Sequence, residues 1–127
     1  MLPSFLLPET TIRDAGTGPE LDLGDLRGGV ILLTLGITRI IEQESLDVSV
    51  WGSRDNVEWG AKPVISFPQK FYCGTYQMLL DLRSRPEVQR LRVKYQVHRW
   101  GKGDPRPLFS AYVFAQAAKQ QALRMTA

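Results

Sequence analysis

The chain has 127 residues, of which 43% are hydrophobic and 23% are charged, and its formal net charge is +3. This length and composition are typical of one folded domain, and no apolar run reaches the roughly 18 residues that a membrane-spanning helix needs. The single cysteine, Cys73, excludes an internal disulfide, and a zinc site would need several further cysteine or histidine ligands. The small, dispersed excess of basic residues does not favour nucleic-acid binding.

The first eight residues contain three consecutive apolar side chains, Phe5, Leu6 and Leu7, flanked by prolines. This segment lacks the basic residues that open a secretory signal, and its prolines interrupt the apolar run. The sequence therefore predicts cytoplasmic synthesis without a signal peptide. The segment is also too apolar for a free tail, so we expect 1–8 to be an extended arm that packs on the body of the protein or on a neighbouring subunit.

The region 9–116 has the residue patterns of short β-strands separated by turns rich in Gly, Pro, Asn and Asp. An almost wholly apolar run at 29–41, with many β-branched residues, favours a strand at the centre of a sheet, and Gly36 within it predicts a bulge. Alternation of apolar and polar residues in 88–100 predicts a strand with one buried face. In chain order, the expected strands are 9–14, 20–23, 29–41, 46–53, 63–67, 75–82, 88–100 and 108–116.

About eight short strands in one domain predict an all-β fold, a single antiparallel β-sandwich of the jelly-roll or Ig-like type over 9–116. The remaining segment, 117–127, is rich in helix formers but has little apolar surface, so we expect a short C-terminal helical tail. No internal repeat or linker divides the chain further.

Residues for catalysis or metal binding are scarce in the sequence. The one histidine, His98, falls on the polar face of the predicted 88–100 strand, where a solvated imidazole is expected. Cys73 follows Lys70 by three positions, but an inert, half-buried cysteine is expected there. The acidic residues lack the spacing of a calcium-binding loop. The sequence therefore predicts no catalytic residue, metal or cofactor, and an enzyme would need several acids converging on His98.

Aromatic residues offer a second kind of site. Trp51, Trp59 and Trp100 fall at strand ends or beside loops, and together with Tyr72 they could stack against sugar rings. Tryptophans at such positions also commonly cap the core of a sandwich. Both interpretations stay open, and the first makes a carbohydrate-binding module the alternative function.

The stretch 46–59 has the order of a strand, a Ser-x-Asp-Asn turn from Ser53 to Asn56, and a returning Trp59. It resembles the S-x-D-G-x-x-W hairpin of discoidin-like carbohydrate-binding sandwiches and of many small phage virion proteins, with Asn56 in place of the usual glycine. The phage resemblance covers about 20–116, where an LDLG strand precedes an apolar strand, the LDVSV hairpin, an LRVKY strand and a final aromatic strand. It implies a structural component of a virion, such as a head-decoration, neck or tail protein, without an active site.

Together with the missing catalytic groups, these features predict a structural protein that associates with itself or with a larger protein particle. We expect the contacts to involve both terminal segments and the charged loop 101–106, and we expect no binding to membranes or nucleic acid. The residues expected at this interface are Phe5, Leu6, Leu7, Lys102, Asp104, Arg106 and Leu123.

Overall fold

The computed structural model describes residues 3–24, 27–40, 44–54, 59–60, 62–99 and 108–118, with only the backbone of Arg99. Within these residues the fold is all-β and contains no α-helix. The described strands are β1 (Ser4–Ile12), β2 (Gly16–Thr17), β3 (Leu21–Asp22), β4 (Val30–Ile40), β5 (Glu44–Ser53), β6 (Ile65–Ser66), β7 (Gly74–Asp81), β8 (Arg90–Arg99) and β9 (Phe109–Ala117).

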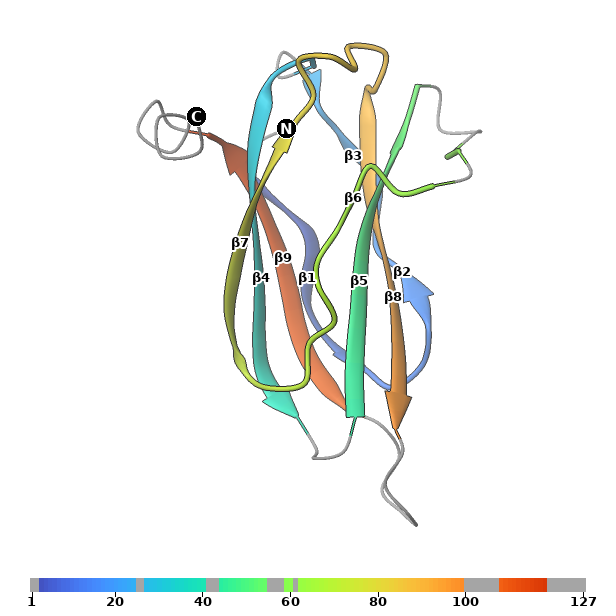
Figure 1. Ribbon diagram of the computed structural model, residues 1–127, viewed down its shortest axis with the longest axis vertical. Helices are drawn as coiled ribbons and strands as arrows, with labels where there is room; N and C mark the ends of the chain where they lie inside the picture. Colours follow the sequence, from blue (N-terminus) through green and yellow to red (C-terminus); the bar gives the residue numbers. More distant parts are fainter. Residues whose placement is uncertain are drawn as a thin grey trace.

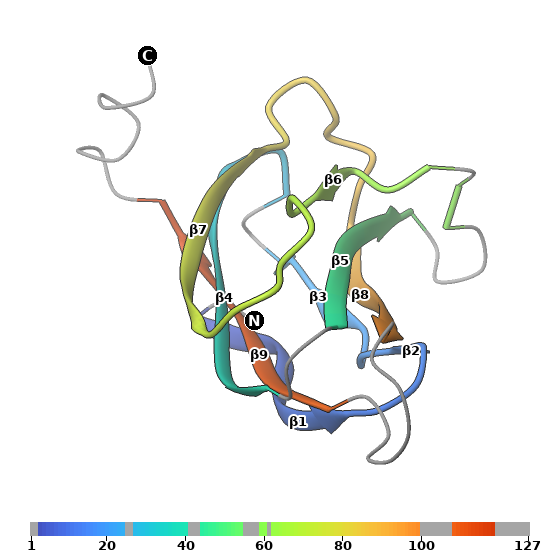
Figure 2. The same cartoon turned by 60° about the horizontal axis from the view of Figure 1, so that its bottom comes forward.

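The strands form two antiparallel sheets that face each other as two layers (Figure 1, Figure 2). Sheet A has the order β1-β9-β4-β7, and sheet B has the order β2-β8-β5-β6, with β3 also paired to β8. Strands β2 and β3 occupy the same edge of β8, because Gly16 pairs with Tyr95 and Leu21 pairs with Leu91, while β5 takes the other edge. The prediction of an all-β protein built from antiparallel strands is confirmed.

The core lies between the two sheets and follows from alternation along their strands. In β8, Leu91 and Val93 are fully buried, whereas the intervening Arg92 lies on the outer face. In β9, Phe109 is the largest fully buried side chain of the described residues. Leucine, isoleucine and valine side chains from β4 and β5 belong to the same core cluster.

The N-terminal segment differs from the expected arm. Residues from Ser4 onward belong to β1, which pairs with β9 along one edge of sheet A. The register shifts between Phe5 and Leu7 and again between Leu7 and Thr10. These irregularities allow consecutive residues, Leu6 and Leu7, both to be buried in the core. The boundary that we expected at residue 8 between an arm and the sheet is therefore not seen.

The C-terminal segment begins as strand. Ala117 is the last residue of β9, and the Ala118 N–H donates a hydrogen bond to the Val30 carbonyl oxygen at 3.0 Å. The helical tail that we expected over 117–127 therefore does not include Ala117. The rest of it, from residue 119, lies outside the described residues.

Candidate functional site

Three aromatic rings gather on the outer face of sheet A, the face turned away from sheet B. Phe5 of β1 contacts Tyr112 and Phe114 of β9 edge to face, with ring centroids 5.9 and 5.0 Å apart. The two β9 rings point outward because the alternate residues of that strand fill the core. Phe5 is 47% exposed. We call Phe5, Tyr112 and Phe114 the aromatic face.

Gly36 of β4 lies directly beneath the ring of Tyr112. A Cβ atom at this position would collide with that ring, so the absence of a side chain allows the ring to lie against the sheet. The bulge expected at Gly36 is not present there, because Gly36 pairs in register with Thr75 and with Tyr112. The irregularity in β4 falls instead between Ile37 and Arg39.

The surroundings of the aromatic face carry little charge. A shallow hollow of about 420 Å³ is lined by its rings together with Thr34 and Glu9. Leu32 of β4 and Gln77 and Leu79 of β7 lie on the same side of the sheet, because the residues that alternate with them pack on the core. A flat, largely uncharged surface with clustered aromatic rings fits another protein surface better than a charged small ligand.

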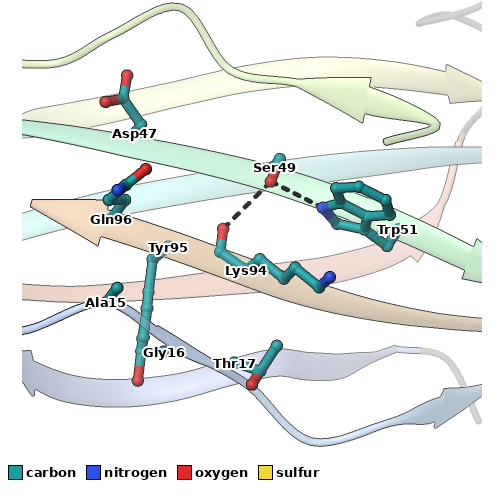
Figure 3. A pocket seen from close by; sticks show the side chains of 9 residues that line it. All are labelled: Ala15, Gly16, Thr17, Asp47, Ser49, Trp51, Lys94, Tyr95 and Gln96. Carbon is teal, nitrogen blue, oxygen red and sulfur yellow. Dashed lines mark hydrogen bonds between the residues drawn. The ribbon is translucent and has the colours of Figure 1, made fainter. Parts of the chain in front are cut away.

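A second hollow, of about 440 Å³, lies on the outer face of sheet B (Figure 3). The Trp51 Nε1–H donates to Ser49 Oγ at 3.0 Å, and the Ser49 hydroxyl donates to the Lys94 carbonyl oxygen at 3.4 Å. Lys94 Nζ lies 4.1 Å from the centre of the Trp51 ring, a cation–π contact. Asp47 and Gln96 add polar groups to the lining. This hollow therefore combines the aromatic residues Trp51 and Tyr95 with several hydrogen-bonding groups from β5 and β8.

Trp59, one of the residues proposed to bind sugar, is instead packed into the protein. Its side chain is only 8% exposed, and the Arg92 guanidinium lies 4.3 Å from the centre of its ring. The Arg92 Nε–H is buried without a hydrogen-bond partner. The cation–π contact with the Trp59 ring is therefore the interaction that favours this buried part of the guanidinium. Trp59 is therefore buried against the outer face of sheet B, outside the core cluster between the sheets, and it offers little ring surface to a sugar.

Tyr72 and Trp51 are too far apart to form one platform. Tyr72 is 72% exposed and follows the bridge between Lys70 and Leu46, near the beginning of β5. Trp51 is near the other end of this strand, on the order of 16 Å from Leu46 at the usual rise of a β-strand. Trp100, the fourth predicted sugar-binding residue, lies outside the described residues.

The residues predicted for an assembly interface have different positions in the structure. Phe5 is exposed and belongs to the aromatic face, but Leu6 and Leu7 are buried in the core and cannot contact a partner. Sequence reasoning missed Tyr112 and Phe114, although their alternation with buried residues in 108–116 was a usable signal. The remaining predicted interface residues, Lys102, Asp104, Arg106 and Leu123, lie outside the described residues.

Several basic residues around β8 are matched by local acidic partners. Arg83 Nη2 lies 2.7 Å from Asp81 Oδ2. Hydrogen bonds from the Arg83 side chain and backbone hold the pKa of the Asp81 carboxyl at about 2, below its ordinary 3.8, and the same pair raises the pKa of Arg83. Arg90 lies 3.7 Å from Asp22. These pairs reduce the free positive charge that a nucleic acid could contact.

The described residues contain no group of three or more His, Cys, Asp or Glu side chains placed to hold a metal ion. His98 is exposed on β8, as its place in the alternating pattern predicts, and Cys73 is a free, exposed thiol rather than the half-buried one expected. In the part of the chain that the structure describes, no helix has the length and apolar character needed to cross a membrane.

Comparison with known proteins gives no family. No model of a protein family matches the sequence, and a search of curated proteins finds no significant match. Function is therefore inferred from the geometry of the outer faces of sheet A and sheet B.

Proposed function

We propose that the protein is a non-enzymatic structural component that associates with copies of itself or docks on a larger protein particle, using the aromatic face as a contact surface. The observation that carries this proposal is the exposure of Phe5, 47%, within a cluster that also includes Tyr112 and Phe114. Clustered, exposed aromatic side chains are typical of protein interfaces. The sequence resemblance to phage virion proteins over about 20–116 agrees with this function.

We further propose that the fold is a jelly roll. This is supported by the strand pairing when β2 and β3 are counted as one edge strand, so that the nine strands become eight. The first strand then pairs with the last, the second with the next to last, and so on inward, as β1 with β9, β2 and β3 with β8, β4 with β7, and β5 with β6. Jelly rolls occur in viral capsid proteins and in lectins, so the fold is compatible with assembly and with sugar binding.

Replacing Phe5 by serine is expected to weaken self-association of the full chain by about tenfold or more, because an exposed aromatic anchor is lost from the contact surface. The measurement is light scattering of the purified protein over a wide range of concentrations. Phe71→Ser is the matched control, because Phe71 is 41% exposed but lies outside the aromatic face. It should associate like the wild type.

A wild-type chain that stays monomeric at high concentration would contradict self-association. Equal weakening by Phe5→Ser and Phe71→Ser would assign the effect to general surface apolarity rather than to the aromatic face. Thermal unfolding of each variant checks that the fold is retained.

A carbohydrate-binding function is the second candidate, and it is favoured by the hollow on sheet B. Sugar recognition needs an aromatic surface beside polar groups that can bond hydroxyls. Trp51 provides the first, and Asp47, Ser49 and Gln96 provide the second. The Lys94 ammonium over the Trp51 ring occupies space that a sugar would need, so binding requires this side chain to move.

If the second function is correct, titration with glycans should change the tryptophan fluorescence of the wild type, and Trp51→Ala should abolish the change because the stacking surface is removed. Ser84→Ala is a suitable control, since Ser84 is an exposed polar residue that does not line the hollow. Absence of a response from the wild type across a glycan array rejects this function.

A further inference from the structure

The unpaired edges of the two sheets differ sharply in how well they are protected against pairing with another strand. An edge strand has backbone N–H and C=O groups without partners, and proteins commonly protect such strands with proline, bulges, short length or charge. Among the described strands, the edges are β1 and β7 in sheet A, and β6 and the β2–β3 pair in sheet B.

Three of these edges have such protection. Strand β1 contains Pro8 and two shifts of register. Strand β6 is only two residues long. The edge formed by β2 and β3 is interrupted at Pro19, after the Gly18 N–H bond to the Val93 carbonyl oxygen. None of these edges offers a long, regular row of free backbone groups.

Strand β7, at the margin of sheet A in Figure 1, has such protection only at its last residue, Asp81, whose carboxylate pairs with Arg83. It has eight residues, and it pairs with β4 without a shift of register from Gly74 to Asp81. Residues 74–80, with the sequence GTYQMLL, include no charged residue and no proline. A long, regular, uncharged edge of this kind is the type that pairs with another strand.

The backbone groups available for pairing follow from two backbone hydrogen bonds, one made by Leu82 and one by Ala118. The Leu82 N–H donates to the Gly29 carbonyl oxygen at 2.9 Å, so the Leu82 backbone faces β4. In an antiparallel ladder the direction alternates along the strand, so the backbone groups of Thr75, Gln77 and Leu79 face away from β4. The Ala118 N–H donates to the Val30 carbonyl oxygen, so the backbone groups of Val30 face β9. Those of the next residue, Ile31, then face Leu80 of β7, which fits the same alternation.

We propose that two copies of this chain pair along β7 in antiparallel orientation, with Gln77 on the two-fold axis. With this axis, both cores lie on the same side of the joined sheet. This requires that residues paired across the axis differ by an even number of positions, because alternate side chains of a strand point to opposite faces. Gln77 then lies opposite Gln77 of the second copy, Thr75 lies opposite Leu79, and by symmetry Leu79 lies opposite Thr75. These three bonded pairs supply about six backbone hydrogen bonds, two for each pair.

The side chains favour a second copy as the occupant because the register is self-complementary. Residues 74–80 carry no charge, so pairing them in this register places no like charges of the two strands opposite each other. On the inner side, Tyr76 of one copy meets Met78 of the other. Met78 is only partly buried at the margin of the core, so the second copy would cover apolar surface there. The Tyr76 ring already contacts Lys70 Nζ, 3.9 Å from its centre, and its hydroxyl donates to the Tyr72 carbonyl oxygen.

The pairing joins the two A sheets into one continuous sheet, with the two aromatic faces on the same side. This deepens the proposed assembly function and rests on it, because a paired unit could then contact a particle through two equal surfaces. Two linked contacts hold far more tightly than one when the geometry allows both to bind.

The test uses a charge exchange at the axis in the full chain. Gln77→Lys brings two lysines together and should weaken pairing about tenfold or more, and Gln77→Glu should do the same. An equimolar mixture of the two variants should restore the dimer mass in light scattering, because each pair then unites opposite charges. Gln89→Lys is the matched control, since Gln89 is a partly exposed glutamine outside β7 and outside the hollow on sheet B.

Hydrogen exchange gives an independent readout. The amides of Thr75, Gln77 and Leu79 should be protected at concentrations that favour the dimer and should exchange faster in Gln77→Lys. A multimer that Gln77→Lys leaves unchanged, or a mixture that fails to restore pairing, overturns the β7 proposal. If that multimer is weakened by Phe5→Ser, the assembly function stands without β7 pairing; a wild-type chain that is always monomeric overturns both.

Discussion

Phe109→Ala is expected to lower the free energy of unfolding by about 3–5 kcal/mol, among the largest effects of a single substitution in this chain. Phe109 is 0% exposed and opens β9, where it pairs with Ile12 of β1 and Ile40 of β4. Alanine would remove the ring and leave a cavity that neighbouring strands can fill only in part. The measurement is urea denaturation, with the midpoint compared at unchanged slope.

Phe114→Ala is the matched control for this prediction, because it is the same change on the same strand but on the outer face. Phe114 is partly exposed and its ring contacts Phe5, so its replacement is expected to cost about 1 kcal/mol. Equal losses from the two substitutions would contradict the assignment of Phe109 to the core and Phe114 to the surface.

The sequence was informative where alternation is regular. The pattern from Leu91 to Val97 identified the buried and exposed faces of β8, because a strand without bulges turns every second side chain to the same side. The same rule places Tyr112 and Phe114 outside and Val113 inside. If the side of β9 that carries Tyr112 and Phe114 had been assigned to the outer face of its sheet, these rings could have been recognised from the sequence as a surface cluster.

Other features could not be predicted, because they depend on contacts between distant parts of the chain. Leu6 and Leu7 are consecutive and both buried, which requires the irregular pairing of β1 with β9. Gly36 suggested a bulge in isolation, but its role depends on the Tyr112 ring from another strand. For Trp59, capping of the core was the commoner expectation, but its ring lies against Arg92 on the outer face of sheet B, a contact that the sequence pattern does not reveal.

The two outer faces also differ in chemistry in a way that composition alone does not reveal. On sheet B, Arg92 and Lys94 lie over tryptophan rings, so cationic and aromatic groups satisfy each other within the chain. On sheet A, the rings of the aromatic face contact one another and the backbone at Gly36, and no cation of the described residues lies over them. This difference is why sheet A is the stronger candidate for contact with a separate protein.

Glu44→Leu is expected to destabilise the protein by about 1–3 kcal/mol, although leucine is apolar and similar in size. Glu44 opens β5 and is only 1% exposed, and its Oε1 accepts a hydrogen bond from the Leu108 N–H at 2.9 Å. Leucine would leave that backbone N–H, which is also buried, without this acceptor.

Glu44→Gln separates hydrogen bonding from packing, because its side-chain oxygen can still accept the Leu108 N–H. It should therefore retain more stability than Glu44→Leu in urea denaturation. Hydrogen exchange at the Leu108 amide is the local measurement: protection should persist in the glutamine variant and be lost in the leucine variant. If Glu44→Leu matches the wild type in both measurements, the Glu44 bond does not hold the start of β9. The junction between β5 and β9 would then depend on the neighbouring buried side chain of Phe109 instead.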